Sequence, residues 1–351
     1  MIESLFGDSR KELFIRPETF STFSDTEKEN HIEKVFQFYR KNGFPYFPTH
    51  RPYRIKKLSQ ALACRIDEQI DRDNKTIRQS MNGLAFCWSY HPQAFGVKCN
   101  TMRTPIEVFE SDELFRRLLW KCGSEKMGQG WHDSQLRLTC SIFSGTQRVS
   151  NFRPSAAAAI YKIFCHKGDS VYDMSSGYGG RCLGAHMAKM KYFGVDPCTQ
   201  NFNGVQSMIS EFGFDAKIKN IGSEIGGWLN ENQIDFSFTS PPYFNCEKYS
   251  DEPTQSFLKY PSRELWLTGF IRKTLQACQR VTKPNRFIAL NVANVQSYKT
   301  MVEDIIELAN SLGMILDDVW KLNLTKLMKS KSEKTKSGFK SEPILIFKNV
   351  K

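Results

Sequence analysis

Residues 234 to 244 read Ile-Asp-Phe-Ser-Phe-Thr-Ser-Pro-Pro-Tyr-Phe, and this stretch decides the fold. The β-rich run 234–238 is followed at once by Ser240-Pro241-Pro242-Tyr243. Proline has no N–H to donate to a sheet ladder and fixes its own φ, so the strand must end here. The next residues form a stiff loop at the carboxyl end of a strand, which is where open α/β sheets place their chemistry.

The sequence on both sides of this loop alternates between strand-like and helix-like patterns. Strands are predicted at 170–173, 192–195, 216–221, 234–238, 286–291, 314–322 and 343–347, with helices between most of them. Strands that alternate with helices predict a parallel sheet with right-handed crossovers. The last two strands have no helix between them, which predicts an antiparallel edge hairpin. The predicted fold class is therefore α/β, with a mostly parallel seven-stranded sheet.

The first 145 residues have a different, mixed α+β pattern. We therefore expect an N-terminal region at 1–145, followed by the sheet domain at 146–351. Helices are predicted over 25–42, 57–79 and 112–121, with short strands over 83–109. The proline-rich and aromatic stretch 43–54 has two readings. Its rings and arginines could contact nucleic acid, or its aromatics could pack on the domain.

Composition limits the class of protein. Of 351 residues, 40% are hydrophobic and 25% are charged, as in soluble globular proteins. We find no apolar run of the ~20 residues that span a bilayer and no secretory signal pattern. The 10 cysteines are scattered singly, which predicts a reduced, cytoplasmic protein without a metal site. The net charge of +12 favours a polyanionic partner without identifying it.

A glycine-rich turn, Asp173-Met-Ser-Ser-Gly-Tyr-Gly-Gly180, follows the first predicted strand of the sheet. Its glycines allow the backbone to bend and a ligand to approach closely. Asp196 ends the second strand, where an adenosine ribose is often held through its hydroxyls. Ser223 or Glu224, after the third strand, could meet an adenine edge. The other reading of these residues is a structural turn with surface acids.

These motifs resemble those of a known family. Asp173-x-Ser-x-Gly-x-Gly-Gly180 and Thr239-Ser-Pro-Pro-Tyr-Phe244 are similar to motifs I and IV of the S-adenosylmethionine-dependent amino-methyltransferases of DNA. The resemblance covers about residues 151 to 350, and Glu342-Pro-Ile-Leu-Ile-Phe347 is similar to the last strand of such enzymes. It implies a class I (Rossmann-like) methyltransferase fold and S-adenosylmethionine as the cofactor.

The resemblance also implies roles for individual residues. Asp196 would bind the cofactor ribose, and Arg153 with Pro154 would occupy the place of motif X. The residues that would hold the methionine part of the cofactor are Asp173, Ser175, Gly177, Gly179 and Gly180.

The loop after the fourth strand would act on an exocyclic base amine, which is a poor nucleophile because its lone pair is delocalised into the ring. Ser240 Oγ and the Pro241 carbonyl could accept the two amine hydrogens and turn the lone pair towards the methyl group. Tyr243 or Phe244 would stack on a base flipped out of double-stranded DNA. Pro241 and Pro242 would fix this geometry before the base arrives.

Several alternatives remain for the substrate. Within the resembling family, serine before Pro-Pro-Tyr goes more often with cytosine N4, and adenine N6 is the alternative. RNA amines and an inactive, cofactor-binding DNA-binding protein are further readings. Methylation at carbon 5 of cytosine is disfavoured, because Pro197-Cys198 follows the second strand and not the fourth.

DNA recognition is expected to fall to residues 1–145, with the loop at 245–262 as a further candidate. The basic segment 326–340, including Lys329 and Lys331, either clamps phosphates or is a solvated hairpin tip. We expect a bacterial or phage protein that does not act at membranes. A restriction or defence-system partner is compatible with the sequence, which contains no evident nuclease motif.

Overall fold

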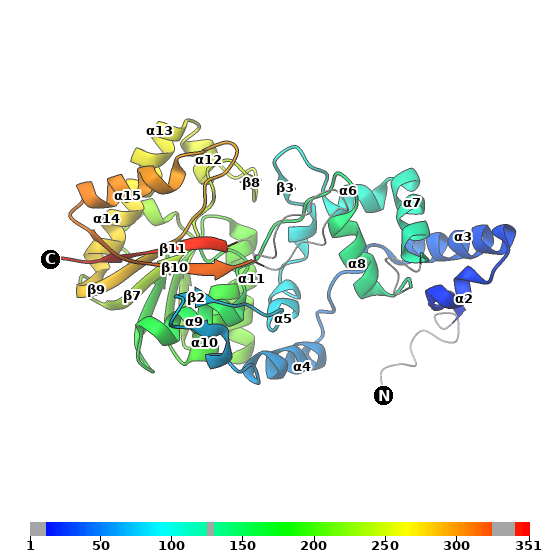
Figure 1. The fold of residues 1–351 in the computed structure, drawn as a ribbon, viewed down its shortest axis with the longest axis horizontal. Coiled ribbons are helices and arrows are strands. Elements are labelled where there is room, and N and C mark those ends of the chain that lie inside the picture. The colour runs from blue at the N-terminus through cyan, green and yellow to red at the C-terminus, as the bar shows by residue number, and fades with distance from the viewer. Residues whose placement is uncertain (1–11, 125–129, 325–340) are drawn as a thin grey trace. The chain divides into compact units, whose positions relative to one another are not determined.

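The chain forms two compact units in a computed structural model that describes residues 12–124, 130–324 and 341–351 (Figure 1). One unit consists of residues 1–47 and 92–149, and the other of residues 48–91 and 150–351. This division differs from the predicted boundary at 145, because residues 48–91 belong with the sheet. Lys329 and Lys331 lie outside the described residues.

The first unit is mostly helical where it is described. Its elements are α2 (Pro17–Ser21), α3 (Asp25–Asn42), η2 (Pro92–Gly96), β3 (Lys98–Cys99), α6 (Pro105–Glu110), α7 (Asp112–Cys122) and α8 (Asp133–Ile142). Ser24 and Glu27 form a capping box that begins α3, close to the predicted start of this helix at residue 25. Trp131 is fully buried in this core, and its indole Nε1 donates to the carbonyl of Leu119 at 2.8 Å.

The second unit is built on a sheet in the order β1-β2-β10-β11-β9-β7-β4-β5-β6. The strands are β1 (Ile70–Asp71), β2 (Thr76–Ile77), β4 (Ser170–Asp173), β5 (Lys191–Val195), β6 (Ala216–Lys219), β7 (Ile234–Thr239), β9 (Thr282–Asn291), β10 (Ile315–Asn323) and β11 (Ser341–Lys348). Strands β4, β5, β6, β7 and β9 pair in parallel, whereas β11 runs antiparallel to both β9 and β10. The predicted mostly parallel sheet with an antiparallel hairpin is confirmed, and the seven predicted strands are present; the short strands β1 and β2, which were not predicted, bring the sheet to nine strands.

Helices cover both faces of the sheet (Figure 1). One core lies under α9 (Pro154–Phe164), α10 (Gly180–Ala188) and α11 (Thr199–Phe212). The other lies under η4 (Trp266–Ile271), α14 (Arg272–Val281) and α15 (Met301–Ser311). Alanines 156 to 159 are fully buried, and a Cβ at Gly184 would lie 2.5 Å from the Cβ of Ala157. Small residues therefore let α9 and α10 pack closely.

Two predicted segments are wrong. The helix expected over 57–79 is α4 (Arg51–Leu62), followed by η1 (Asp67–Gln69) and the β1–β2 hairpin. Asp71 accepts from the backbone N–H of Asn74, and this contact forms the turn of the hairpin. The strands expected over 83–109 are mainly the helices α5 (Leu84–Trp88) and α6. Fully buried Ile77 on β2 pairs with Leu322 of β10, which explains why 48–91 joins the sheet.

Several residues of the stretch 43–54 contact the rest of the protein, although only Phe44 and Pro45 are buried. Phe44 is buried in the helical unit, where it contacts Phe95 and Phe109. Arg54 lies over the ring of Tyr90 and pairs with Glu211 at 2.6 Å. These contacts favour the packing reading of the stretch over a nucleic-acid contact.

Two further observations concern the whole of the described chain. Within the described ranges, the helices are too short or too polar to span a bilayer. All ten cysteines lie in the described ranges and none of them forms a disulfide; eight are buried, and Cys64 and Cys246 are partly exposed.

Candidate active site

The predicted motifs meet at one edge of the sheet. Strand β4 lies between β5 and β7 and is parallel to both, so the carboxyl ends of the three strands are neighbours. Asp173 is the last residue of β4, Asp196 follows β5, and Ser240 follows β7. The fold therefore brings together residues that are far apart in the sequence.

The side chain of Asp173 connects the elements that meet at this edge. Its carboxylate is fully buried and accepts four hydrogen bonds. Oδ1 accepts from the Thr239 hydroxyl at 2.8 Å and from the Ser175 N–H at 3.1 Å. Oδ2 accepts from Arg181 Nε at 2.9 Å and from the Tyr192 hydroxyl at 2.7 Å. One carboxylate thus joins β4, β5, β7 and the first turn of α10.

This arrangement corrects the role expected for Asp173. A carboxylate has about four lone-pair positions, and in this structure protein donors use all of them. Asp173 therefore holds the turn in shape and leaves no acceptor for a cofactor. Arg181, which the motif reading did not include, is buried beside it and also donates to the carbonyl of Ser175. An arginine placed directly after two glycines at a helix start is the signal that could have indicated this pairing.

The three glycines of the turn have different functions. A Cβ at Gly180 would overlap the carbonyl oxygen of Phe152, and one at Gly179 would lie 2.9 Å from Met208 Cε. Gly177 is different, because an added Cβ would meet only the Ser175 carbonyl oxygen, at 3.8 Å. Gly177 has a φ of +53° and Gly179 a φ of +76°, which glycine adopts at little cost. Of the three positions, only Gly177 leaves room for a ligand.

Asp196 closes the turn from the neighbouring strand. Its Oδ2 accepts from the Gly177 N–H at 2.7 Å, and its Oδ1 accepts from the Cys198 N–H at 2.9 Å. Burial raises the pKa of Asp196 to about 7, although these two backbone hydrogen bonds oppose the rise. Both oxygens keep acceptor capacity beyond these two donors, which suits the hydroxyl pair of a ribose.

Ser223 and Glu224 lie on η3 (Ser223–Ile225), after β6. The hydroxyl of Ser223 is buried and pairs with that of Thr274 at 2.7 Å. The carboxylate of Glu224 folds back towards Gly222 and forms an ion pair with Lys259. Both side chains are thus engaged by other residues of the protein, and their contact with an adenine edge stays a prediction.

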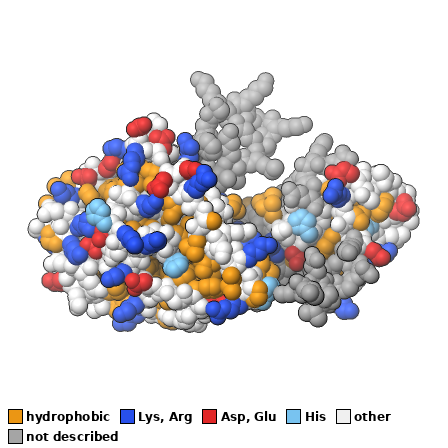
Figure 2. Space-filling view, turned by 90° about the horizontal axis from the view of Figure 1, so that it is seen from below, with side chains coloured by type: hydrophobic (Ala, Val, Ile, Leu, Met, Phe, Trp, Pro, Cys, Tyr) orange, Lys and Arg blue, Asp and Glu red, His pale blue; other side chains and the backbone are white. Residues whose placement is uncertain are grey.

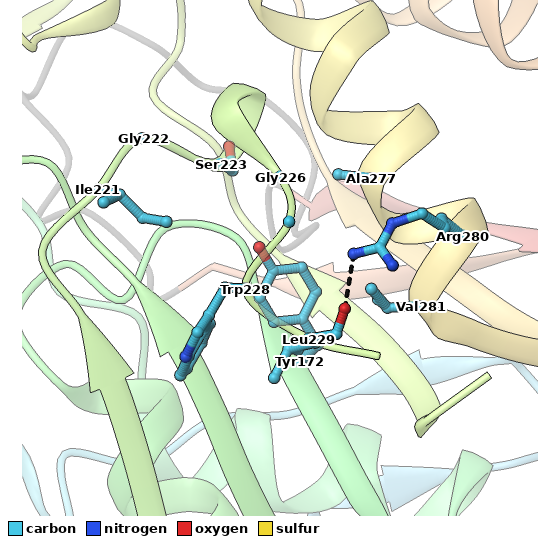
Figure 3. Close-up of a pocket in the computed structure, with 11 residues that line it drawn as sticks. Tyr172, Ile221, Gly222, Ser223, Gly226, Trp228, Leu229, Ala277, Arg280 and Val281 are labelled. Atoms are coloured by element: carbon cyan, nitrogen blue, oxygen red, sulfur yellow. Dashed lines mark hydrogen bonds between the residues drawn. The ribbon is translucent and has the colours of Figure 1, made fainter. Parts of the chain in front are cut away.

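A small pocket lies next to Ser223 (Figure 3). Its wall includes Gly222, Gly226 and Trp228, and Arg280 of α14 donates to the Leu229 carbonyl at 2.6 Å. Asp173, Asp196 and Ser240 do not line it. We place the chemistry at the strand ends and not in this pocket.

The segment that follows the proline loop folds back over the ends of β5 and β6. Glu252 accepts from the Thr199 hydroxyl at 2.7 Å at the start of α11, and the Thr254 hydroxyl donates to the Pro197 carbonyl at 3.1 Å. Lys259 of α12 (Ser256–Lys259) supplies the ion pair to Glu224. Residues 245–262 thus contact the loop after β5 and the loop after β6, which were both expected to flank the cofactor.

Arg153 is the N-cap residue of α9, and its guanidinium donates to Met81 Sδ. Burial lowers the pKa of Arg153. The preceding residues touch the glycine turn, because Asn151 Nδ2 donates to the Tyr178 carbonyl at 3.2 Å. The segment that resembles motif X therefore lies beside motif I, through Asn151 and Phe152 more than through Arg153.

The proline loop itself is half-buried. The Tyr243 hydroxyl donates towards Glu342 Oε2 at 3.2 Å and the Asn291 carbonyl at 3.4 Å. Phe244 is 6% exposed and packs edge-on against Trp266 and Tyr298. Phe244 is thus a core residue, which corrects its expected role as a ring that stacks on the base. Tyr243 remains the candidate for that role.

Two observations indicate that the residues at this edge can accommodate S-adenosylmethionine. The turn is open at Gly177, and the Asp196 carboxylate has unused acceptor capacity next to it. Gly177 would lie against the methionine part, and Asp196 would accept from the ribose hydroxyls.

Comparisons with known proteins add little beyond the fold. The chain matches no family model and no curated protein. Among solved structures it is similar to TrmN from Thermus thermophilus, with 12% identity, a TM-score of 0.39 and coverage of 56% of this chain and 48% of that chain. The chain thus spans about half the length of that protein.

Two shorter proteins of known structure are similar to the chain at about the same level. A SAM-dependent methyltransferase from Aquifex aeolicus has 15% identity, a TM-score of 0.38 and coverage of 55% of this chain and 89% of that one. A methyltransferase from Pyrococcus furiosus has 15% identity, a TM-score of 0.38 and coverage of 61% and 94%, respectively. Similarity at this level does not define a function, so we base the function on the residues of this chain.

Proposed function

We propose that the chain is an S-adenosylmethionine-dependent methyltransferase that acts on an exocyclic base amine of DNA, with cytosine N4 preferred. The observation that carries this proposal is the 2.8 Å hydrogen bond from Thr239 to Asp173. It ties the start of the Ser-Pro-Pro-Tyr loop to the glycine turn. The residues proposed to bind the amine and those proposed to bind the methyl donor are thereby held in one fixed relation.

The chemistry that we propose needs orientation more than a strong base. When bound, S-adenosylmethionine would supply an electrophilic methyl group. Ser240 Oγ and the Pro241 carbonyl would accept the two amine hydrogens, and Pro242 stiffens the loop that presents them. The acceptors are fixed before the base arrives, so little reorganisation is needed during the reaction. The nitrogen becomes more acidic as the methyl bond forms and can lose a proton to water.

The net charge of +12 is compatible with a nucleic-acid substrate. Lysine and arginine side chains are spread over the face in Figure 2, with acidic side chains among them. Adenine N6 of DNA and amines of RNA are the alternative substrates. An inactive DNA-binding protein is less consistent with the intact set of Asp196, Ser240 and Tyr243.

A methyl-transfer assay tests the proposal. Tritiated S-adenosylmethionine would be incubated with the full chain and with unmethylated DNA or structured RNA, and modified bases in the product would be sequenced. We expect label in DNA and a loss of about a hundredfold or more in Ser240→Ala. Ser311→Ala, an exposed serine on α15, is the matched control.

Two results would contradict the proposal. One is the absence of label in every nucleic acid with wild-type protein that binds S-adenosylmethionine. The other is a Ser240→Ala rate close to that of Ser311→Ala. Label in RNA alone would move the substrate to the RNA alternative.

A further inference from the structure

The order of the strands sets the direction in which the parts of the cofactor would follow one another. The methionine part of S-adenosylmethionine is expected at Gly177, after β4, and the ribose at Asp196, after β5. Strand β6 pairs in parallel with β5, so its carboxyl end is the next one along this edge. The adenine is attached to the ribose opposite the methionine part. It is therefore expected at the loops that follow β5 and β6.

Residues 252–259 lie over these two loops. On one side, the Thr254 hydroxyl donates to the Pro197 carbonyl at 3.1 Å, in the loop after β5. On the other side, Lys259 forms an ion pair with Glu224, after β6. The adenine would therefore lie beneath this segment.

Gln255 is a buried polar residue of this segment. It follows Thr254 directly and is 3% exposed, whereas Thr254 and Leu258 are exposed to solvent, so the Gln255 side chain lies on the inner side of the segment. It is the N-cap residue of α12, but its side chain forms no capping hydrogen bond. Its amide nitrogen, Nε2, has no hydrogen-bond partner among the described residues. Buried donors are rarely left without a partner, so this position favours an acceptor that a ligand brings.

The chemistry of an amide donor fits adenine. The ring nitrogens N1, N3 and N7 of adenine accept hydrogen bonds, and glutamine amides donate to such a nitrogen when they read adenine in DNA. The two residues first expected at the adenine are engaged elsewhere, Ser223 by Thr274 and Glu224 by Lys259. Gln255 Nε2 is thus a donor in this part of the site that the protein itself does not use.

We propose that Gln255 is a cofactor-binding residue whose Nε2 donates to a ring nitrogen of the adenine of S-adenosylmethionine. This inference rests on the proposed function and adds a residue that lies outside the glycine turn and the loop after β6. Residues 252–259 cover the amide in the structure, so they move outward to admit the adenine and then close over it. The hydrogen bond forms away from water, which strengthens it.

Calorimetry with S-adenosylhomocysteine tests the inference without depending on methyl transfer, because this product carries the same adenine. Gln255→Met keeps the length of the side chain and removes the donor. We expect it to weaken the affinity about three- to tenfold, the effect of one hydrogen bond. Gln60→Met changes an exposed glutamine on α4 (Arg51–Leu62) and is the matched control, which should bind like the wild type.

Deaza analogues of S-adenosylhomocysteine identify the acceptor. In the 1-deaza, 3-deaza and 7-deaza compounds, a C–H group replaces one ring nitrogen. One of them should bind the wild-type protein about three- to tenfold more weakly than the parent compound, and this difference should disappear in Gln255→Met. The wild-type measurements do not depend on how well the variant folds.

Three results would overturn the inference and leave the proposed function intact. The first is that all three analogues bind the wild-type protein as tightly as the parent compound. The second is that Gln255→Met binds S-adenosylhomocysteine as tightly as Gln60→Met does. The third is that the analogues lose as much affinity in Gln255→Met as in the wild type, since the effect of the variant would then be structural. If the wild-type protein binds neither S-adenosylmethionine nor S-adenosylhomocysteine, the proposed function itself fails.

Discussion

Replacing the buried carboxylate of Asp173 by an amide should destabilise the sheet unit strongly. Asp173→Asn keeps the shape but removes the charge that pairs with Arg181, whose side chain is 6% exposed. An uncompensated buried charge costs about 3–5 kcal/mol. The new amide N–H₂ must also replace one of the two carboxylate oxygens. In one orientation it faces the Arg181 and Tyr192 donors, and in the other the Thr239 and Ser175 donors, so in both a donor faces a donor. We expect a loss of about 4 kcal/mol in the free energy of unfolding, since these costs do not add fully.

The measurement must report on one unit, because a chain with two units need not unfold in a single transition. Native-state hydrogen exchange of peptides from β4 and β5 reads the local free energy of opening. Asp317→Asn, an exposed aspartate on β10, is the matched control and should change this free energy by less than about 0.5 kcal/mol.

A second variant separates the charge from the shape of the site. Asp173→Asn combined with Arg181→Met removes the buried cation as well, so it should be less destabilised than Asp173→Asn alone. The reasoning is refuted if Asp173→Asn costs less than about 1 kcal/mol, or if the double variant loses the sum of the two single losses.

Two further predictions concern the cofactor turn. Gly180→Ala should lower the free energy of unfolding by about 3 kcal/mol or more, because the added Cβ overlaps the Phe152 carbonyl. Gly177→Ala should lower it by about 1 kcal/mol because of the positive φ at this position, and it should weaken S-adenosylmethionine binding measured by calorimetry. Equal stability of the two variants would contradict this. Asp196 has a folded pKa of about 7, above its unfolded value of about 3.9, so its contribution to stability is present at low pH and is lost as the pH rises from about 4 through about 7. Because the charged carboxylate accepts from ribose hydroxyls, S-adenosylmethionine should bind more weakly below about pH 7. The pH dependence of stability and that of binding should both vanish in Asp196→Asn. A pH profile that this variant leaves unchanged would refute the assignment.

The sequence by itself determined the sheet. Proline cannot continue a strand, and apolar runs that alternate with helical patterns leave few other architectures, so the seven strands and the antiparallel hairpin were predictable. The acid after β5 and the loop after β7 could be placed at one edge for the same reason. Predictions failed where short elements depend on distant partners. The β1–β2 hairpin exists because Ile77 can pair with Leu322 of β10, and nothing within residues 57–79 indicates that partner.

Only the tertiary structure decided which groups of the site remain available to a ligand. Asp173 and Gly180 look like ligand contacts in the motif. In the structure, however, protein donors fill the hydrogen-bond positions of the Asp173 carboxylate, and the backbone of Phe152 packs against Gly180. Phe244 is adjacent to Tyr243 in the sequence, but a φ of +53° turns it into the core between Trp266 and Tyr298. Glu342 reaches Tyr243 only because β11 runs antiparallel to β9. Local sequence specifies strands and turns, whereas hydrogen-bond saturation and packing depend on residues that the chain brings together only when it folds.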